Sequence, residues 1–208
     1  RAGHVAASIA LTQAAADYGL SSVLAFHNTI AASSEFAATF RRTHALLAAR
    51  GLVRDGRGAK VIHIDGSTKL SDRLAATQTL AIHDPAQWNM VTNARCLTEG
   101  INIPALDAVF FAEPRSSEVD VAQAVGRAIR KNPNHDRPAL IVLAVTVDDS
   151  QDAETVIDIS EFKRARQVLT ALQSHDPTLT RDLALVRQRL VDGLGADDAA
   201  DVETEILD

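Results

Sequence analysis

One glutamine and two arginines are spaced so that a helix could present all three on one face. The stretch QAVGRAIRK places Gln123, Arg127 and Arg130 at intervals of four and three residues. Because an α-helix turns by about 100° per residue, these side chains fall within one narrow arc. Two planar guanidiniums and an amide suit the oxygens of a phosphate group. The solvated face of an amphipathic helix is the alternative, and the spacing alone does not decide between them.

A second polar segment, VTNARCLTEGINIP at 91–104, begins where an apolar strand-like stretch ends. Thr92 and Asn93 stand at that end, and exposed backbone N–H groups behind them would suit contacts with phosphate. An ordinary loop between a strand and a helix is the alternative, because ligand sites occupy only some of the strand ends in an α/β sheet.

Motifs for other kinds of chemistry are missing from the sequence. The stretch DGRGAK has two glycines before Lys60, but the P-loop spacing G-x-x-x-x-G-K-[ST] occurs nowhere in the chain. The seven histidines show no metal-ligand spacing, and Cys96 is the only cysteine, so we expect no metal site and no internal disulfide. The serine-hydrolase pattern G-x-S-x-G is absent too.

Composition and charge restrict the class of protein and its partners. Hydrophobic residues make up 46% of the 208 residues and aromatic residues only 4%, which predicts a core of Ala, Val, Leu and Ile. The net charge is −6, but six of the 27 acidic residues lie in 195–208, so the remainder holds 21 acidic and 21 basic residues. Contact with nucleic acid must therefore be local, because the body has no overall positive charge.

Several features bear on where the protein works. A single cysteine is typical of the reducing cytoplasm, and no apolar run approaches the roughly 20 residues that a membrane helix needs. We therefore expect a cytoplasmic protein that makes no membrane contact. The chain starts at Arg1 without a signal-peptide pattern, which predicts a segment of a longer polypeptide.

Short apolar stretches alternate with helical patterns along the chain. We expect strands at 23–26, 61–64, 88–92, 108–112 and 139–145, and helices at 4–18, 31–50, 70–82 and 118–131. The alternation predicts an α/β fold, a parallel sheet with helices on both faces, whose strand ends form a ligand-binding edge. We expect this domain to span 1–147, a helical extension 148–194, and a disordered acidic tail 195–208.

Four segments resemble motifs IV, IVa, V and VI of the superfamily 2 helicases, in the family's order. They read SVLAFHNTIAASSEFA, HIDGSTKLSDRLAATQTL, VTNARCLTEGINIPALDAVFFAEP and QAVGRAIRK. The resemblance covers 22–145 and is to the C-terminal RecA-like domain, with the character of DEAD/DEAH-box enzymes that have a restriction-type helicase core. Gln123, Gly126, Arg127 and Arg130 complete the family pattern Q-x-x-G-R-x-x-R.

The resemblance implies a catalytic role for this helix. Arg127 and Arg130 would be arginine fingers for ATP, which with Mg²⁺ would be bound mainly by an N-terminal RecA-like domain of the same polypeptide. Gln123 would contact the γ-phosphate or the attacking water, and Gly126 would let the partner approach closely. Hydrolysis would drive a helicase or translocase along DNA or RNA, whereas this domain alone, which lacks a P-loop, would be inactive.

The resemblance also implies binding residues. Gly100 and Asn102 would lie near the ribose side of the nucleotide cleft, although the family commonly has aspartate where this chain has Asn102. Five residues would hold the nucleic-acid backbone: His27, Asn28, Gly66, Thr92 and Asn93. A non-catalytic RecA-like module that binds protein or nucleic acid is the alternative. A P-loop and an acidic Mg²⁺-binding motif upstream in the full-length polypeptide would favour the motor over it.

Overall fold

The elements follow the expected alternation of helices and strands. The structure is a computed structural model, and it describes residues 2–94, 106–112 and 139–144. In chain order the elements are α1 (Ala2–Asp17), β1 (Ser22–Phe26), α2 (Ile30–Ala49), β2 (Gly58–Ile64), α3 (Leu70–Thr79), β3 (Gln87–Asn93), β4 (Ala108–Phe111) and β5 (Leu140–Leu143). The helix expected at 118–131, the extension and the acidic tail lie outside the described residues, so the domain limits stay predictions.

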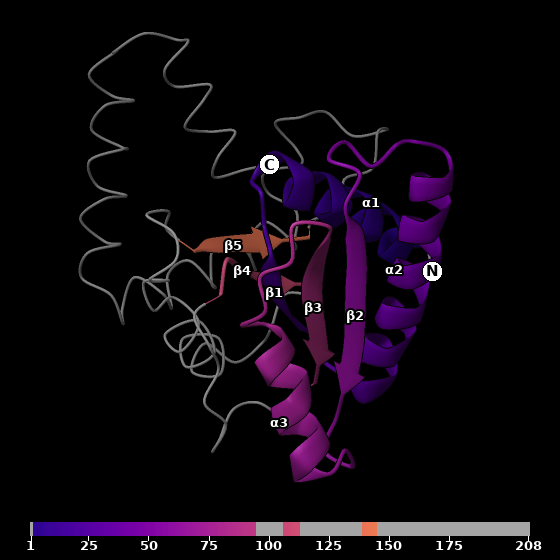
Figure 1. Ribbon diagram of the computed structural model, residues 1–208. Coiled ribbons are helices and arrows are strands. Elements are labelled where there is room, and N and C mark those ends of the chain that lie inside the picture. The colour runs from indigo at the N-terminus through magenta and orange to yellow at the C-terminus, as the bar shows by residue number, and fades with distance from the viewer. Residues whose placement is uncertain (1, 95–105, 113–138, 145–208) are drawn as a thin grey trace, which may run out of the picture.

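The described strands form one parallel sheet in the order β2-β3-β1-β4-β5 (Figure 1). Phe26 at the end of β1 pairs with Asn93 at the end of β3 and with Phe111 at the end of β4. Ile64 at the end of β2 also pairs with Asn93. These four strands therefore end side by side, and the predicted parallel α/β fold with a common carboxyl edge is confirmed.

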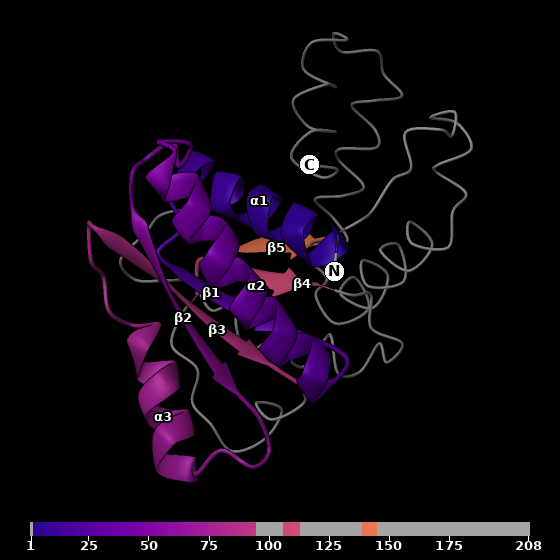
Figure 2. The ribbon, with the colours of Figure 1, turned by 90° about the vertical axis from the view of Figure 1, so that its right-hand side faces the viewer.

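Helices cover both faces of the sheet. In Figure 2, α1 and α2 lie side by side in front of the strands, and their Leu11 and Phe36 share one core cluster with Trp88 and Met90 of β3. Asn89 points to the other face, because successive side chains of a strand alternate. There its Nδ2 donates to the carbonyl of Ile82, just after α3, at 3.1 Å.

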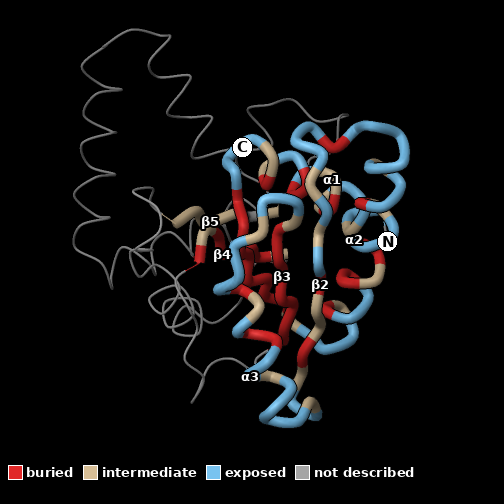
Figure 3. Tube along the Cα trace, in the orientation of Figure 1, coloured by how far each residue is buried: buried red, intermediate tan, exposed pale blue. Residues whose placement is uncertain are grey.

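The central strands are apolar without alternation because they are covered on both sides. All five residues of β1 and all four of β4 are buried, whereas in β2 at the sheet edge only Val61 and Ile64 are buried (Figure 3). Trp88 and Phe36 are among the largest side chains that are fully buried. The prediction of a core made of Ala, Val, Leu and Ile is therefore incomplete, because five of the six phenylalanines and the single tryptophan are buried in the core as well.

α1 and α2 run parallel to each other, because residues that are further along α1 contact residues that are equally further along α2. The rings of His4 and Phe36 are perpendicular, with 5.7 Å between their centroids, and eight residues further along each helix Thr12 Oγ1 lies 3.4 Å from His44 Nδ1. α2 begins at Thr29, whose hydroxyl accepts from the N–H of Ala32 at 3.1 Å. Both helices consequently start near the carboxyl edge of the sheet.

The opposite, amino edge is closed by the segment that leads into β2. Arg57 Nη2 donates to the carbonyl of Ala15 at 2.7 Å, and its Nε pairs with Asp55 at 2.5 Å. His44 Nε2 lies 3.2 Å from the carbonyl of Arg57. These contacts tie the ends of α1 and α2 to the start of β2.

Candidate nucleic-acid interface

The structure brings the five predicted nucleic-acid contacts to one edge of the sheet. His27 and Asn28 follow β1, Gly66 lies in the loop after β2, and Thr92 and Asn93 end β3. The in-register parallel pairing explains this, because three strands separated in sequence end at the same level. Contact between these residues and nucleic acid stays a prediction.

These five residues differ in what they offer to a ligand. The side chains of His27, Thr92 and Asn93 are fully buried, Asn28 is half-buried, and Gly66 is exposed. Two of the buried residues, His27 and Asn93, join the ends of β1 and β3. The N–H of His27 donates to the carbonyl of Asn93 at 3.0 Å, and Asn93 Nδ2 donates to that of Ala25 at 3.1 Å.

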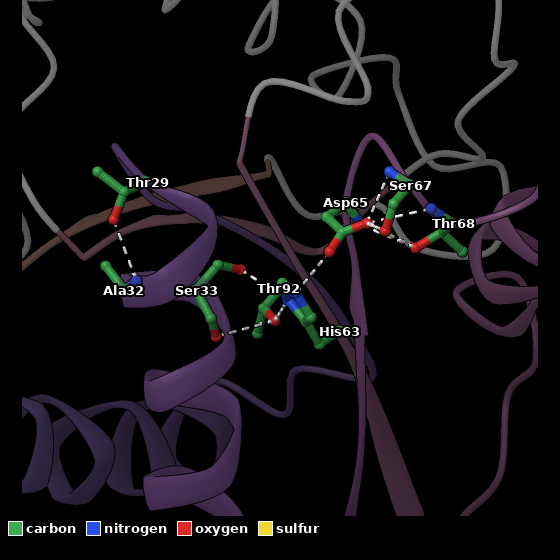
Figure 4. A network of polar contacts seen from close by, with 8 residues as sticks. All are labelled: Thr29, Ala32, Ser33, His63, Asp65, Ser67, Thr68 and Thr92. Atoms are coloured by element: carbon green, nitrogen blue, oxygen red, sulfur yellow. Dashed lines mark hydrogen bonds and ion pairs between the residues drawn. The ribbon is translucent and has the colours of Figure 1, made fainter.

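A polar network joins α2, β2 and β3 just below this edge (Figure 4). His63 Nδ1 lies 3.0 Å from Ser33 Oγ and 3.3 Å from Thr92 Oγ1. Thr92 Oγ1 donates in turn to the carbonyl of Ser33 at 3.4 Å. Ser33 and Thr92 are fully buried, so these contacts form without competition from water. His63 of β2 thus contacts both of the other elements in this network, α2 and β3.

Asp65 organises the loop that follows β2. Its Oδ1 accepts from the N–H and hydroxyl of Ser67, at 2.8 and 2.6 Å, and from the N–H of Thr68 at 3.0 Å. These bonds lower the pKa of Asp65 to about 2, and the bond from the Ser67 hydroxyl has the largest effect. The loop therefore carries a fixed negative charge at neutral pH.

The imidazole of His63 connects the network to this loop. Its Nε2 lies 3.7 Å from Asp65 Oδ2. Burial lowers the pKa of His63, the carboxylate of Asp65 opposes that shift, and the cation of Arg41 adds to it. The ring is therefore neutral at pH 7, a form that can both donate and accept a hydrogen bond.

The set Ser33, His63 and Asp65 has the composition of a nucleophile with its base and orienting acid. Ser33 lies inside α2 with no exposed surface, so its hydroxyl cannot meet a substrate in this arrangement. Within the described residues, no group of three or more His, Cys, Asp or Glu side chains could hold a metal ion. The contacts among Ser33, His63 and Asp65 therefore support a structural role, in which they hold the loop after β2 in position.

Sequence reasoning missed Ser33 and His63 as parts of the site. A histidine inside the apolar stretch VIHI was the available signal, since a polar residue in a covered strand needs a partner. For the loop, the signal was D-G-S-T, in which an Asp side chain accepts from N–H groups two and three residues later. Neither signal identifies the partners, because these come from other elements.

The predicted catalytic and nucleotide-binding residues lie outside the described part of the chain. These are Gly100, Asn102, Gln123, Gly126, Arg127 and Arg130. Their roles stay predictions based on the sequence pattern. Across the described residues, none of the helices is long and apolar enough to span a membrane.

Comparison with known proteins decides the family. Residues 18–132, more than half of the chain, match the model of the helicase conserved C-terminal domain. The chain belongs to this family. The matched region of this helicase domain contains α2, α3, β1 to β4 and the whole polar edge, and it confirms the resemblance to the C-terminal domain of superfamily 2 helicases.

Two proteins that are similar to this chain are much longer than it. The ATP-dependent Type ISP restriction-modification enzyme LlaBIII, solved bound to DNA, is 29% identical, with a TM-score of 0.67 over 85% of this chain and 12% of its own. A probable helicase of African swine fever virus (isolate Pig/Kenya/KEN-50/1950) is 32% identical over 88 residues, 42% of this chain and 10% of its own. The matched part of this chain thus spans only about a tenth of each relative's own length.

Proposed function

We propose that the protein is the second motor domain of an ATP-dependent helicase or translocase that moves along nucleic acid. The observation that carries the proposal is the polar edge of a helicase C-terminal domain, where the ends of β1, β2 and β3 meet. The similarity to a restriction-modification enzyme described as ATP-dependent and bound to DNA makes DNA the first substrate to test. We also propose a cytoplasmic location.

ATP would be hydrolysed between this domain and an N-terminal RecA-like domain of the same polypeptide. The chain has no P-loop, so the other domain would hold the triphosphate and Mg²⁺. Arg127 and Arg130 would stabilise negative charge on the transferring phosphoryl group, and Gln123 would contact the γ-phosphate or the attacking water. Gly100, Asn102 and Gly126 would line the nucleotide side of the cleft.

The nucleic-acid backbone would lie along the polar edge. Asn28 and Gly66 already present surface there, and the backbone N–H groups of exposed loops bind phosphate without selecting a base. His27, Thr92 and Asn93 would support these loops from below. The contact would be weak in the isolated domain, since few phosphates are neutralised.

The proposal is tested by measuring ATP hydrolysis with and without DNA and RNA. In the complete polypeptide, nucleic acid should stimulate hydrolysis severalfold or more, and the 208-residue chain alone should hydrolyse none. ATP hydrolysis by the chain alone would contradict the proposal that another domain binds the triphosphate.

The second candidate function is a RecA-like binding module that does not turn over ATP. Asn102 favours it, because an amide stands where the family commonly has a carboxylate. Nucleic-acid binding without any stimulated hydrolysis by the complete polypeptide would select this candidate.

A further inference from the structure

His63 stands where three separately encoded parts of the polar edge converge. It is the residue before the last of β2 and is in register with Thr92 of β3. Its ring reaches Ser33 in the first turn of α2 through Nδ1 and Asp65 through Nε2. No other described residue links α2, β2, β3 and the Asp65–Thr68 loop through the polar contacts drawn in Figure 4.

The hydrogen-bonding pattern fits both charge states of the ring. In the neutral state, Nε2–H faces the carboxylate of Asp65, and Nδ1 accepts from the hydroxyl of Ser33 at 3.0 Å. In the charged state, Nδ1–H can donate instead to Thr92 Oγ1, whose own hydrogen is directed at the carbonyl of Ser33. The ring can therefore gain a proton without leaving its place.

The charges around His63 set the effect of that proton. Asp65, on the loop after β2, is the acidic group that faces the ring, and Arg41 of α2 is the basic one. Arg41 is itself held by the carbonyl of Val61, to which its Nε and Nη2 donate at 3.2 and 2.9 Å. Ser33 and Thr92, the contacts from α2 and β3, are uncharged. While His63 is neutral, it does not compensate the negative charge of Asp65, which lies next to the polar edge.

We propose that His63 is a positioning residue that holds the start of α2, the end of β3 and the Asp65–Thr68 loop in one arrangement that binds a nucleic-acid backbone. The inference rests on the proposed function and adds a residue that acts through its neighbours. A bound polyanion favours the charged ring, which then compensates Asp65. Binding is therefore coupled to proton uptake by His63, and affinity rises as the pH falls.

The test measures the affinity of the chain for a fluorescein-labelled single-stranded DNA by anisotropy, from pH 8 to pH 6 at constant low ionic strength. His63→Asn keeps a hydrogen-bonding group near Ser33 but removes the link to Asp65 and the titration. We expect it to weaken binding roughly five- to tenfold at pH 6.5 and to flatten the pH profile. His63→Gln, which can still reach Asp65, should recover part of the affinity but none of the pH dependence.

His44→Asn is the matched control. His44 is also a largely buried histidine with a pKa lowered by burial, but it lies at the amino edge against Thr12 and the carbonyl of Arg57. This variant should lower the melting temperature and leave affinity and its pH profile as in the unaltered chain.

The outcomes separate the inference from the function on which it rests. Unaltered affinity and pH profile in His63→Asn, with binding by the original chain intact, overturns the role of His63 alone. Equal losses in the His63 and His44 variants also overturn it, because they indicate general destabilisation. If the original chain binds neither the DNA nor an RNA of the same length at low ionic strength, the inference fails, and the proposed function fails with it only if the complete polypeptide also binds neither.

Discussion

At the residue scale, the polar edge depends on side chains that a ligand would not touch. His63 and Asp65 determine how the loop after β2 is held, and Thr92 joins the end of β3 to α2. Only part of this was predictable. The sequence pattern placed Thr92 at a strand end, but its burial follows from packing against Ser33. The partner lies 59 residues away in the chain, and no local pattern contains such a pair.

The lowered pKa values predict how stability changes with pH. The pKa of His63 and that of His44 are both lowered by burial from the ordinary 6.5, so the unfolded chain takes up protons first as the pH falls. The free energy of unfolding should therefore decrease from about pH 7 to pH 5. Asp65, whose pKa is lowered from 3.8 to about 2, adds stability that is lost separately between about pH 4 and pH 2.

Urea unfolding of the original chain and of His63→Asn at each pH measures this linkage. The variant should lose part of the slope between pH 7 and pH 5 and keep the loss below pH 4. Identical slopes would show that His63 has the same pKa in the folded and unfolded chain.

At the scale of elements, the amino edge and the carboxyl edge have separate supports. Arg57 is largely buried and links α1 to the start of β2, whereas Arg54 pairs with Asp17 on the surface, with 60% and 40% of their side chains exposed. Replacing Arg57 removes a charged donor from the carbonyl of Ala15, which then accepts only from the N–H of Leu20, and leaves Asp55 without its ion-pair partner. Replacing Arg54 removes only a solvated ion pair.

Arg57→Ala should therefore destabilise the chain by about 1–3 kcal/mol, and Arg54→Ala by less than about 1 kcal/mol. Hydrogen exchange should speed up at the end of α1 in the Arg57 variant and stay unchanged in β3 near Thr92. Faster exchange at both edges would contradict their independence.

At the scale of the whole molecule, the sequence predicted the order of helices and strands along the chain, but only in part which strands lie next to each other in the sheet. Continuous apolar stretches such as VLAF at 23–26 indicated strands covered on both faces, and β1 is indeed the central strand of the sheet. The sheet order and register come from long-range packing. They decide that the ends of β1, β2 and β3 form one edge, which strand patterns alone do not specify.

The central claim also concerns the whole molecule. It is that this helicase C-terminal domain contributes arginines to an ATPase site whose triphosphate is bound by another domain. Nucleic-acid-stimulated ATP hydrolysis by the complete polypeptide, compared between the original sequence and Arg127→Ala or Arg130→Ala, tests it most directly. We expect stimulated hydrolysis to fall by about 10³-fold or more while ATP binding and melting temperature change little. Lysine should not restore it, because an ammonium lacks the planar fork of a guanidinium. Hydrolysis at the original rate in both alanine variants would contradict the account.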